Sequence, residues 1–440
     1  MQAAFFYTEL RRPVILKILC STCFSTFNDN FARENLMDTT TSSSAPASGN
    51  APLYWMALGT FAVGAEGFMI AGILPTVAAD LGVSVAVAGQ LVVAFTAAYA
   101  LSSPVLTALT GAISRRGLLI GAMTAFTLAN LLAWQASGYW SLMTARILLA
   151  FAAGLYVPNA MALAGALVAP ERRGGALALV GGGITVAVAL AAPLGTLIAD
   201  KLSWRMTFAG VALLAALATI GLTLGLPRGI GSKLPVASLR ERMLAARDPA
   251  VLRALLTTLL WATGAYAMYT YFALYLNQVT GIHGAHVGYV LFAWGIAAAI
   301  GVMSGGKIAD RIGFQRVTGP ALMFLIAAFL SLAAIAWLLP QHLAILPVFV
   351  SVIVWGISGW AFYPAQQTNL IHLAGIRLAP IALSLNASFM YLGFSLGASA
   401  GALTVADSSV RNLGLVAAAF VSSALLLKRS VARRTAASAA

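Results

Sequence analysis

Long apolar runs separated by short polar connections fill the chain from about residue 53 to residue 427. Each run is about 20 residues long, which lets a helix cross a hydrocarbon core of about 30 Å. The runs are continuously apolar and do not alternate as the strands of a membrane β-barrel do. The pattern predicts an all-α membrane protein with twelve transmembrane helices. We expect these at residues 53–77, 86–109, 117–137, 141–167, 174–198, 205–226, 252–276, 284–304, 317–339, 343–366, 379–403 and 411–427.

Composition excludes a soluble domain. Hydrophobic residues make up 60% of the 440 residues, charged residues make up 9%, and the mean hydropathy is +0.90. Soluble domains carry about 25% charged residues. A soluble fold of this length has too little interior to hide so much apolar surface, so the lipid bilayer is the expected surrounding.

Basic residues concentrate in every second connection between the predicted helices. This set comprises Arg115, Arg116, Arg172, Arg173, Arg228, Lys233, Arg240, Arg242, Arg247, Arg253, Lys307, Arg311, Arg316, Arg377, Lys428, Arg429, Arg433 and Arg434. The opposite connections hold only Lys201, Arg205 and Arg411. The positive-inside rule places the basic set, and both termini, in the cytoplasm. The net charge of +14 therefore indicates topology and contact with anionic lipid. It does not indicate a nucleic-acid partner.

The connections also divide the chain into parts. We expect a leader at 1–52, an N-terminal six-helix bundle at 53–226, a cytoplasmic linker at 227–251, a C-terminal six-helix bundle at 252–427 and a cytoplasmic tail at 428–440. The leader holds the only two cysteines, Cys20 and Cys23, without the second pair that a metal site needs. We expect Met37 to be the true start, with a signal peptide around the short apolar run 13–20 as the alternative.

Glu66 is the one acidic residue that lies inside a predicted transmembrane helix. An unpaired carboxylate at this depth costs several kcal/mol when it is ionised, so an acidic residue there is a functional candidate. Burial disfavours the charged form, and the side chain is expected to carry a proton for part of the time. Arg146 is the one basic residue placed inside a helix, a few residues from its outer end. Its alternative interpretation is an arginine that reaches the outer membrane interface.

Two turns repeat in the two halves. The turn after the second helix reads GAISRRG and ends at Gly117, and the turn after the eighth reads GKIADRIG from Gly306 to Gly313. Internal repeats with a binding site between them are a common plan in transporters. The fourth helix contains Arg146 followed by Gly154, and the fifth contains GGGITVAVALAAPLG, in which Pro193 removes a backbone hydrogen bond.

These segments are similar to motifs of the major facilitator superfamily, within its drug:proton antiporter branch. The resemblance covers residues 53–427 and is closest to bacterial sugar, purine and chloramphenicol efflux permeases. It implies the major facilitator fold, a conformational latch at Gly306, Asp310, Arg311 and Gly313, and an antiporter motif at Gly183, Pro193 and Gly195. It also implies that Arg146 takes part in proton transfer with an acidic residue of the first helix. The first-half turn departs from the latch pattern, because Arg115 stands where the aspartate is expected.

Polar and aromatic residues inside the helices outline a candidate substrate cavity. We assign to it Gln90, Tyr99, Tyr266, Tyr269, Trp355, Tyr363, Gln367, Asn386 and Tyr391, with Tyr271, Trp360 and Gln366 as further members. Each of these has an ordinary alternative as a packing residue or an interface anchor. The sequence shows no metal cluster, no catalytic constellation and no nucleotide-binding loop. We therefore expect neither an enzyme nor a cofactor, and a proton gradient as the source of energy.

The sequence predicts a multi-pass, monomeric protein of the bacterial inner membrane. Its expected partners are a small-molecule substrate, protons and the lipid bilayer. We expect it to export a small organic molecule, such as a drug, sugar or nucleobase-like compound, by proton-coupled alternating access. A proton-coupled importer and a uniporter of the same fold are the alternatives. A membrane enzyme or receptor is disfavoured because the chain shows no extramembrane domain.

Overall fold

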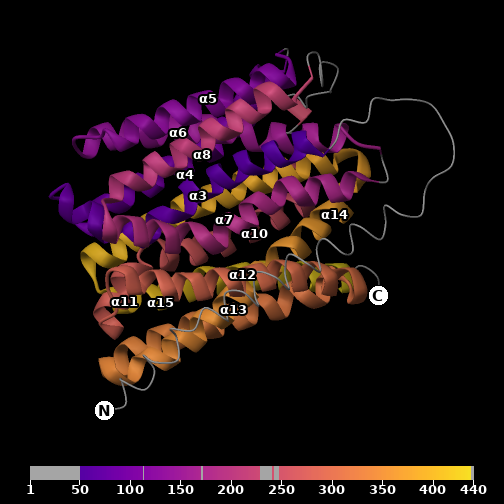
Figure 1. The fold of residues 1–440 in the computed structure, drawn as a ribbon. Helices are drawn as coiled ribbons and strands as arrows, with labels where there is room; N and C mark the ends of the chain where they lie inside the picture. The colour runs from indigo at the N-terminus through magenta and orange to yellow at the C-terminus, as the bar shows by residue number, and fades with distance from the viewer. Residues whose placement is uncertain (1–49, 112, 170–171, 228–239, 242–246, 438–440) are drawn as a thin grey trace, which may run out of the picture. The chain divides into compact units, whose positions relative to one another are not determined.

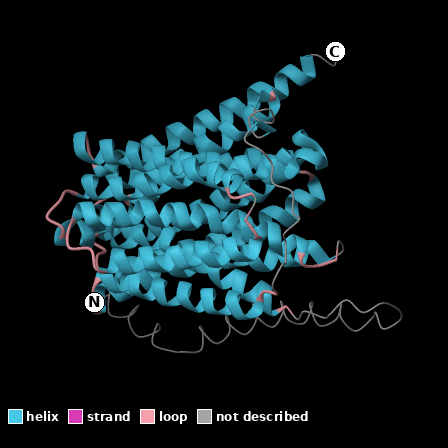
Figure 2. Cartoon of the chain, turned by 90° about the horizontal axis from the view of Figure 1, so that it is seen from above, coloured by secondary structure: helices cyan, strands magenta, loops and turns pink. Residues whose placement is uncertain are grey.

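The computed structural model describes residues 50–111, 113–169, 172–227, 240–241 and 247–437. Within these ranges the chain folds into helices joined by short loops (Figures 1 and 2). The helices of the first half are α3 (Ala51–Asp80), α4 (Val85–Leu109), α5 (Arg115–Trp134), α6 (Tyr139–Ala166), α7 (Arg173–Lys201) and α8 (Trp204–Gly225). Those of the second half are α10 (Pro249–Thr270), α11 (Phe272–Thr280), α12 (Ala285–Ile312), α13 (Phe314–Leu338), α14 (Gln341–Asp407), η2 (Val410–Asn412) and α15 (Leu413–Ala437).

Twelve helical segments in the described part of the chain are long and apolar enough to cross a membrane, which confirms the predicted fold class. Two of them lie within α14, at Gln341–Gly375 and Ile381–Asp407. Gly375 separates them, with a φ of 72° and a ψ of 162°. Glycine adopts this region without the clash that a Cβ atom would cause. The tenth helix thus extends beyond its predicted end at residue 366, because its last turns are helical but polar.

The predicted helix at 252–276 is interrupted. Its first part, α10, ends at Thr270, and α11 resumes at Phe272 after Tyr271, whose φ is −109° and ψ is 15°. The Tyr271 hydroxyl donates to the Ala398 carbonyl oxygen at 3.0 Å, which fixes the side chain at the break. An apolar sequence without proline or glycine at this point gives no signal for such a break.

Polar side chains begin several helices. Ser84 and Ser114 accept hydrogen bonds from the backbone N–H groups of Val87 and Gly117, at 3.2 and 3.3 Å. The Asp248 carboxylate accepts from the first turn of α10, at 2.7 Å from the Ala250 nitrogen. Such caps satisfy N–H groups that have no partner within the helix. The membrane-spanning segments therefore start at defined residues.

Small residues let the helices approach closely. A Cβ atom at Gly183 of α7 would lie 2.3 Å from the Ala57 carbonyl oxygen of α3. At Gly397 of α14 it would lie 2.3 Å from the Thr263 carbonyl oxygen of α10. Packing of this kind is a main source of helix association inside a bilayer. It builds both the α3–α7 and the α10–α14 contacts.

The two halves meet along two further helix pairs. In one pair, α7 lies against α12, where a Cβ atom at Gly295 would come 2.4 Å from the Ala189 Cα atom. In the other, α4 lies against α14, where the Ser395 hydroxyl donates to the Val93 carbonyl oxygen at 3.2 Å. The polar and aromatic residues of both halves are therefore brought to a shared interface.

The leader prediction, with its C-x-x-C motif and Met37, falls on residues 1–49 and lies outside the described residues. Most of the predicted linker also lies outside them, at 228–239 and 242–246, as do residues 438–440 of the tail. The described residues from Asn50 onward form one compact unit.

Candidate functional site

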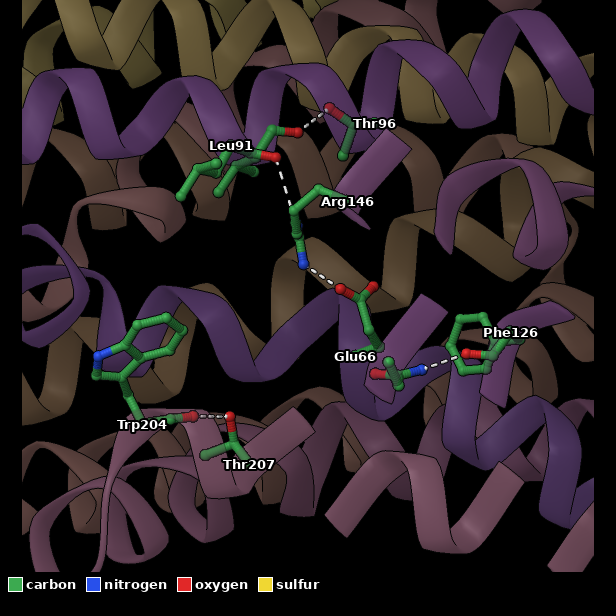
Figure 3. A network of polar contacts seen from close by, with 9 residues as sticks. Glu66, Leu91, Thr96, Phe126, Arg146, Trp204 and Thr207 are labelled. Atoms are coloured by element: carbon green, nitrogen blue, oxygen red, sulfur yellow. Dashed lines mark hydrogen bonds and ion pairs between the residues drawn. The ribbon is translucent and has the colours of Figure 1, made fainter. Parts of the chain in front are cut away.

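Glu66 and Arg146 form a buried ion pair inside the first half. Glu66 projects from α3 and Arg146 from α6, and the side chains of both have no exposed surface. The Arg146 Nη1 atom donates to Glu66 Oε1 (Figure 3). An unpaired charge at such a position is far more costly than a paired one, so each side chain stabilises the other in its charged form. The sequence identified both members of the pair.

The surroundings of the pair hold the arginine more firmly than the carboxylate. Arg146 Nε donates to the Leu91 carbonyl oxygen of α4 at 3.3 Å (Figure 3), and the guanidinium lies 4.5 Å over the ring of Phe95. Glu66 Oε2 and Arg146 Nη2 each have no hydrogen-bond partner among the described residues, but the carboxylate has no hydrogen bond other than the one with the arginine. Glu66 thus has one oxygen bound to the arginine and one oxygen available for a proton.

A narrow aromatic cavity lies between the halves, next to this pair. It is lined by Phe68, Trp261, Ala265, Tyr266, Tyr269, Trp294, Trp355, Gly359, Trp360 and Phe394. Phe68 comes from α3 and the other residues come from α10, α12 and α14. On α10, Trp261, Ala265 and Tyr269 follow one another at intervals of four, which puts them on one face of the helix. The wall is therefore mostly supplied by the second half.

Rings within and beside the cavity pack in close pairs. Tyr266 stacks on Phe394 with ring centroids 3.7 Å apart and an interplanar angle of 17°. Tyr99 stacks on Tyr391 across the interface between the halves, also at 3.7 Å and at 15°. Tyr266 lies close enough to interact electrostatically with Arg146 and Glu66. One tyrosine of the second half thus adjoins both the cavity and the ion pair.

The second half buries a polar cluster that carries no charge. The Thr258 hydroxyl of α10 donates to the Asn386 amide oxygen of α14 at 2.7 Å. Tyr363 lies near the polar side chains of Gln367 and Asn386. The ring of Tyr363 in turn stacks on Trp261, with centroids 6.0 Å apart and an angle of 23°. The cluster is therefore joined to the cavity wall through the stack of Tyr363 on Trp261.

Nine of the twelve predicted cavity residues fall in these groups, and three do not. Tyr266, Tyr269, Trp355 and Trp360 line the cavity. Tyr99 and Tyr391 form a stack, and Tyr363, Gln367 and Asn386 belong to the polar cluster. Gln90 is partly exposed and is not among the residues of the cavity wall.

Two further members have separate positions. Tyr271 packs against Gly89, where a Cβ atom would lie 1.9 Å from its hydroxyl oxygen. Gln366 donates to the Ala254 carbonyl oxygen at 2.7 Å, which ties α14 to α10. Both contacts are those of packing residues.

Sequence reasoning missed several wall residues. These are Phe68, Trp261, Ala265, Trp294, Gly359 and Phe394. The four-residue spacing from Trp261 to Tyr269 was a usable signal for the first tryptophan, because a predicted cavity tyrosine lies on the same helix face. For Trp294 no such signal existed, because it is the only wall residue on α12 and it reaches the cavity through the packing of α12 against other helices.

The two repeated turns differ in the contacts that they make. In the first half, the Arg115 guanidinium is buried and donates to Asn159 Oδ1 at 2.7 Å. Arg116 donates to the carbonyl oxygens of Thr223 and Leu226 at the end of α8, at 2.7 and 2.8 Å. These bonds satisfy carbonyl groups that the helix itself leaves free. The first turn is thus tied to neighbouring helices by its arginines.

In the second-half turn, Asp310 and Arg311 are exposed, and neither forms an ion pair among the described residues. Gly313 has a φ of 89° and ends α12, while Gly306 lies near the Pro364 ring, at 3.8 Å for an added Cβ atom. The backbone conformation at Gly313 thus favours glycine, whereas an added Cβ atom at Gly306 would make only an ordinary van der Waals contact. The charged residues of the predicted latch face outward.

The predicted antiporter motif on α7 packs against both halves. Gly195 approaches α3, where a Cβ atom would lie 3.0 Å from the Met69 Cβ atom. Pro193 lies inside α7, and its carbonyl oxygen would be 3.3 Å from a Cβ atom at Gly288 of α12. Small residues on α7 therefore allow close contact with a helix on each side.

Among the described residues, no group of three metal-ligating side chains comes together.

Comparisons with known proteins match this architecture. The model of the Major Facilitator Superfamily matches residues 56–398. The chain is 34% identical over 378 residues to the MFS-type transporter YbcL of Bacillus subtilis (strain 168), covering 85% of this chain and 94% of that protein. It is 30% identical over 370 residues to a chloramphenicol resistance protein of Streptomyces lividans, covering 82% and 91%.

A solved structure is also similar. It is a bacterial homologue of the human lysosomal transporter Spinster, in an inward-facing and occupied conformation, with a TM-score of 0.71. The match covers 89% of this chain and 98% of that chain at 16% identity, so it shows the fold alone.

Proposed function

This chain belongs to the Major Facilitator Superfamily, and we propose that it exports a small organic molecule in exchange for protons by alternating access. The observation that carries the proposal is the buried pair of Glu66 and Arg146. A membrane protein rarely keeps an ionisable pair at this depth without a task. The multi-pass architecture of twelve spans supports transport across the inner membrane. Both termini lie in the cytoplasm, and the working unit is the monomer.

In the proposed cycle, Glu66 is the proton carrier and Arg146 is its electrostatic partner. Ionised Glu66 neutralises the arginine, and the pair is stable while it stays closed to water. Protonation at Glu66 Oε2, the oxygen without a partner, leaves the Arg146 charge buried and uncompensated. Losing one member of a buried pair costs about 3–5 kcal/mol. A change of conformation that returns solvent or another partner to Arg146 relieves this cost, and so proton binding favours the other state.

Exchange follows if substrate and proton favour opposite forms of this pair. Substrate enters the aromatic cavity from the cytoplasm while the pair is ionised, and it leaves outside when Glu66 takes up a proton. Tyr266 lines the cavity and lies within electrostatic range of the pair, so that it can couple the two events. The small-residue contact of α7 with α12 supports closure between the halves on the outer side. The resistance protein of Streptomyces lividans supports export as the direction.

The first step of the test is to find a transported compound. A resistance and export screen in an efflux-deficient bacterial host, with Glu66→Gln as the inactive control, identifies it. The purified protein is then reconstituted in proteoliposomes, and a pH-sensitive dye reports proton movement driven by a gradient of that compound. An importer would move the compound in the opposite direction under the same pH gradient, and a uniporter would ignore the gradient.

Glu66→Gln keeps the size of the side chain and resembles its protonated form. We expect it to lose proton movement and gradient-driven export completely while it keeps substrate-for-substrate exchange. Glu66→Asp should retain partial activity. Asp407→Asn, which removes an exposed carboxylate at the end of α14, is the matched control and should behave as wild type. If Glu66→Gln still moves protons at the wild-type ratio to substrate, another residue is the carrier.

A further inference from the structure

The wall of the aromatic cavity contains rings and small residues, without a charged side chain. Eight of its ten residues carry the ring of a tyrosine, tryptophan or phenylalanine, and the other two, Ala265 and Gly359, are small. The nearest charges, on Glu66 and Arg146, compensate each other within their pair. A charged ligand would lose its hydration here without gaining a partner of opposite charge, which is costly. The wall therefore favours an uncharged ligand.

Two hydrogen-bond donors of the wall have no acceptor. The Nε1 atoms of Trp261 and Trp294 are buried and have no partner among the described residues. An indole N–H group is only a donor, and its assignment does not depend on the orientation of an amide or on a tautomer. A buried donor without an acceptor costs about 1–3 kcal/mol. A ligand that brings acceptor atoms would recover this cost.

The packing of the rings indicates the shape of the ligand. Tyr266 and Phe394 stack at 3.7 Å, which is the spacing of two flat rings in contact. Trp294 lies 4.8 Å from Tyr269 and 5.5 Å from Trp355, measured between ring centroids. In the narrow form of the cavity these side chains cover one another. A flat ligand can displace one side chain of a stacked pair and stack on the other side chain in its place. The stacking contribution, about 0.5–1.5 kcal/mol beyond burial, is then retained.

We propose that the cavity binds an uncharged, planar aromatic molecule with hydrogen-bond acceptors at its edge. The N–H groups of Trp261 and Trp294 donate hydrogen bonds to these acceptors. This substrate class rests on the proposed transport function, but it concerns binding and not proton coupling. A cationic ring is the main competitor, since aromatic faces attract cations. The two indole donors oppose it, because the cationic group itself is no acceptor and places its positive charge near two N–H donors.

Equilibrium binding to three matched probes tests the proposal. The full-length protein in lipid nanodiscs is titrated calorimetrically with methyl 4-acetamidobenzoate, with the cation 4-acetamidophenyl-trimethylammonium, and with p-cymene, which has no acceptor. Empty nanodiscs give the background of lipid partitioning. We expect the ester to bind at least about fivefold more tightly than either other probe, the ratio that one hydrogen bond typically supplies. Equal or tighter binding of the cation or of p-cymene, or no binding of the ester, would overturn the proposal.

Variants then test the two donors. Trp294→Phe and Trp261→Phe keep an aromatic side chain and remove the N–H group, and each should weaken ester binding about fivefold relative to p-cymene binding. Trp140→Phe is the matched control because Trp140 is 76% exposed on α6, and it should change neither affinity. A loss shared equally by the ester and p-cymene would reject the donor role. No proton gradient is present in these titrations, so their failure would leave the coupling role of Glu66 standing.

Discussion

The two halves of the molecule bury different kinds of polar side chain. Among the described residues, the charged side chains that are buried are Glu66, Arg115 and Arg146, and all three belong to the first half. The second half buries threonines, serines and amides, with Asn386 at its centre, and it supplies most of the aromatic cavity wall. Two bundles of similar architecture therefore provide different chemistry at one interface.

This difference suggests that proton coupling and substrate binding are carried by different halves of the fold. A charged pair responds to proton binding, because its energy changes sharply when one charge is lost. An uncharged aromatic wall responds to the shape and the acceptors of a ligand instead. Tyr266 adjoins both, and Tyr99 of the first half stacks on Tyr391 of the second. We therefore expect substitutions in the first half to alter proton coupling and substitutions in the second half to alter substrate affinity.

The largest effect is expected from Arg146→Gln. It leaves Glu66 buried without its partner, which should destabilise the protein by about 3–5 kcal/mol. Thermal unfolding in nanodiscs measures the change. Combining Glu66→Gln with Arg146→Gln removes both charges and should recover most of the stability, while proton-coupled export stays absent.

Arg205→Gln is the matched control for that prediction. Arg205 pairs with Asp80 at 2.7 Å, but their side chains are 29% and 43% exposed. An exposed pair is worth about 1 kcal/mol or less. A double variant that recovered coupled export as well as stability would show that the pair is structural, and the proposed division between the halves would be lost.

The sequence was sufficient for the ion pair and insufficient for much of the cavity. Charged residues are rare inside apolar helices, so Glu66 and Arg146 were visible without knowledge of their neighbours. Tryptophans are common both in helix interiors and at membrane interfaces, so their type alone does not assign them to a wall. Trp294 reaches the cavity through helix packing across the molecule, and the break at Tyr271 depends on its bond to the Ala398 carbonyl oxygen. Information of this kind is tertiary and has no local pattern.

An intermediate effect is expected in the second half from Thr258→Val. The substitution keeps the side-chain shape and leaves the Asn386 amide oxygen without its donor, which should cost about 1–3 kcal/mol of stability. Because the cluster supports Trp261 through Tyr363, the KM for a transported compound should rise while the ratio of protons to substrate stays unchanged. Thr124→Val, at an exposed hydroxyl of α5, is the control and should change neither quantity. A changed proton ratio in Thr258→Val would place coupling in both halves.

The smallest effect on stability is expected from Asp310→Asn in the second-half turn. Asp310 is exposed, lies in the last turns of α12 and forms no ion pair among the described residues. A negative charge at a helix C-terminus opposes the helix dipole, so its removal should stabilise the protein slightly, by about 0.3–1 kcal/mol. The transport rate should nevertheless fall severalfold, because a latch forms its charge contact in another conformation of the transport cycle. The loss of that contact would slow transport without lowering the stability of the present conformation.

Arg116→Gln in the first-half turn should show the reverse pattern, with lower stability and a smaller loss of transport rate. Its hydrogen bonds to the end of α8 are already formed in this conformation. Unfolding temperature and initial transport rate, measured on the same preparations, separate the two patterns. Wild-type transport by Asp310→Asn would show that the second-half turn is a connection between helices and not a latch.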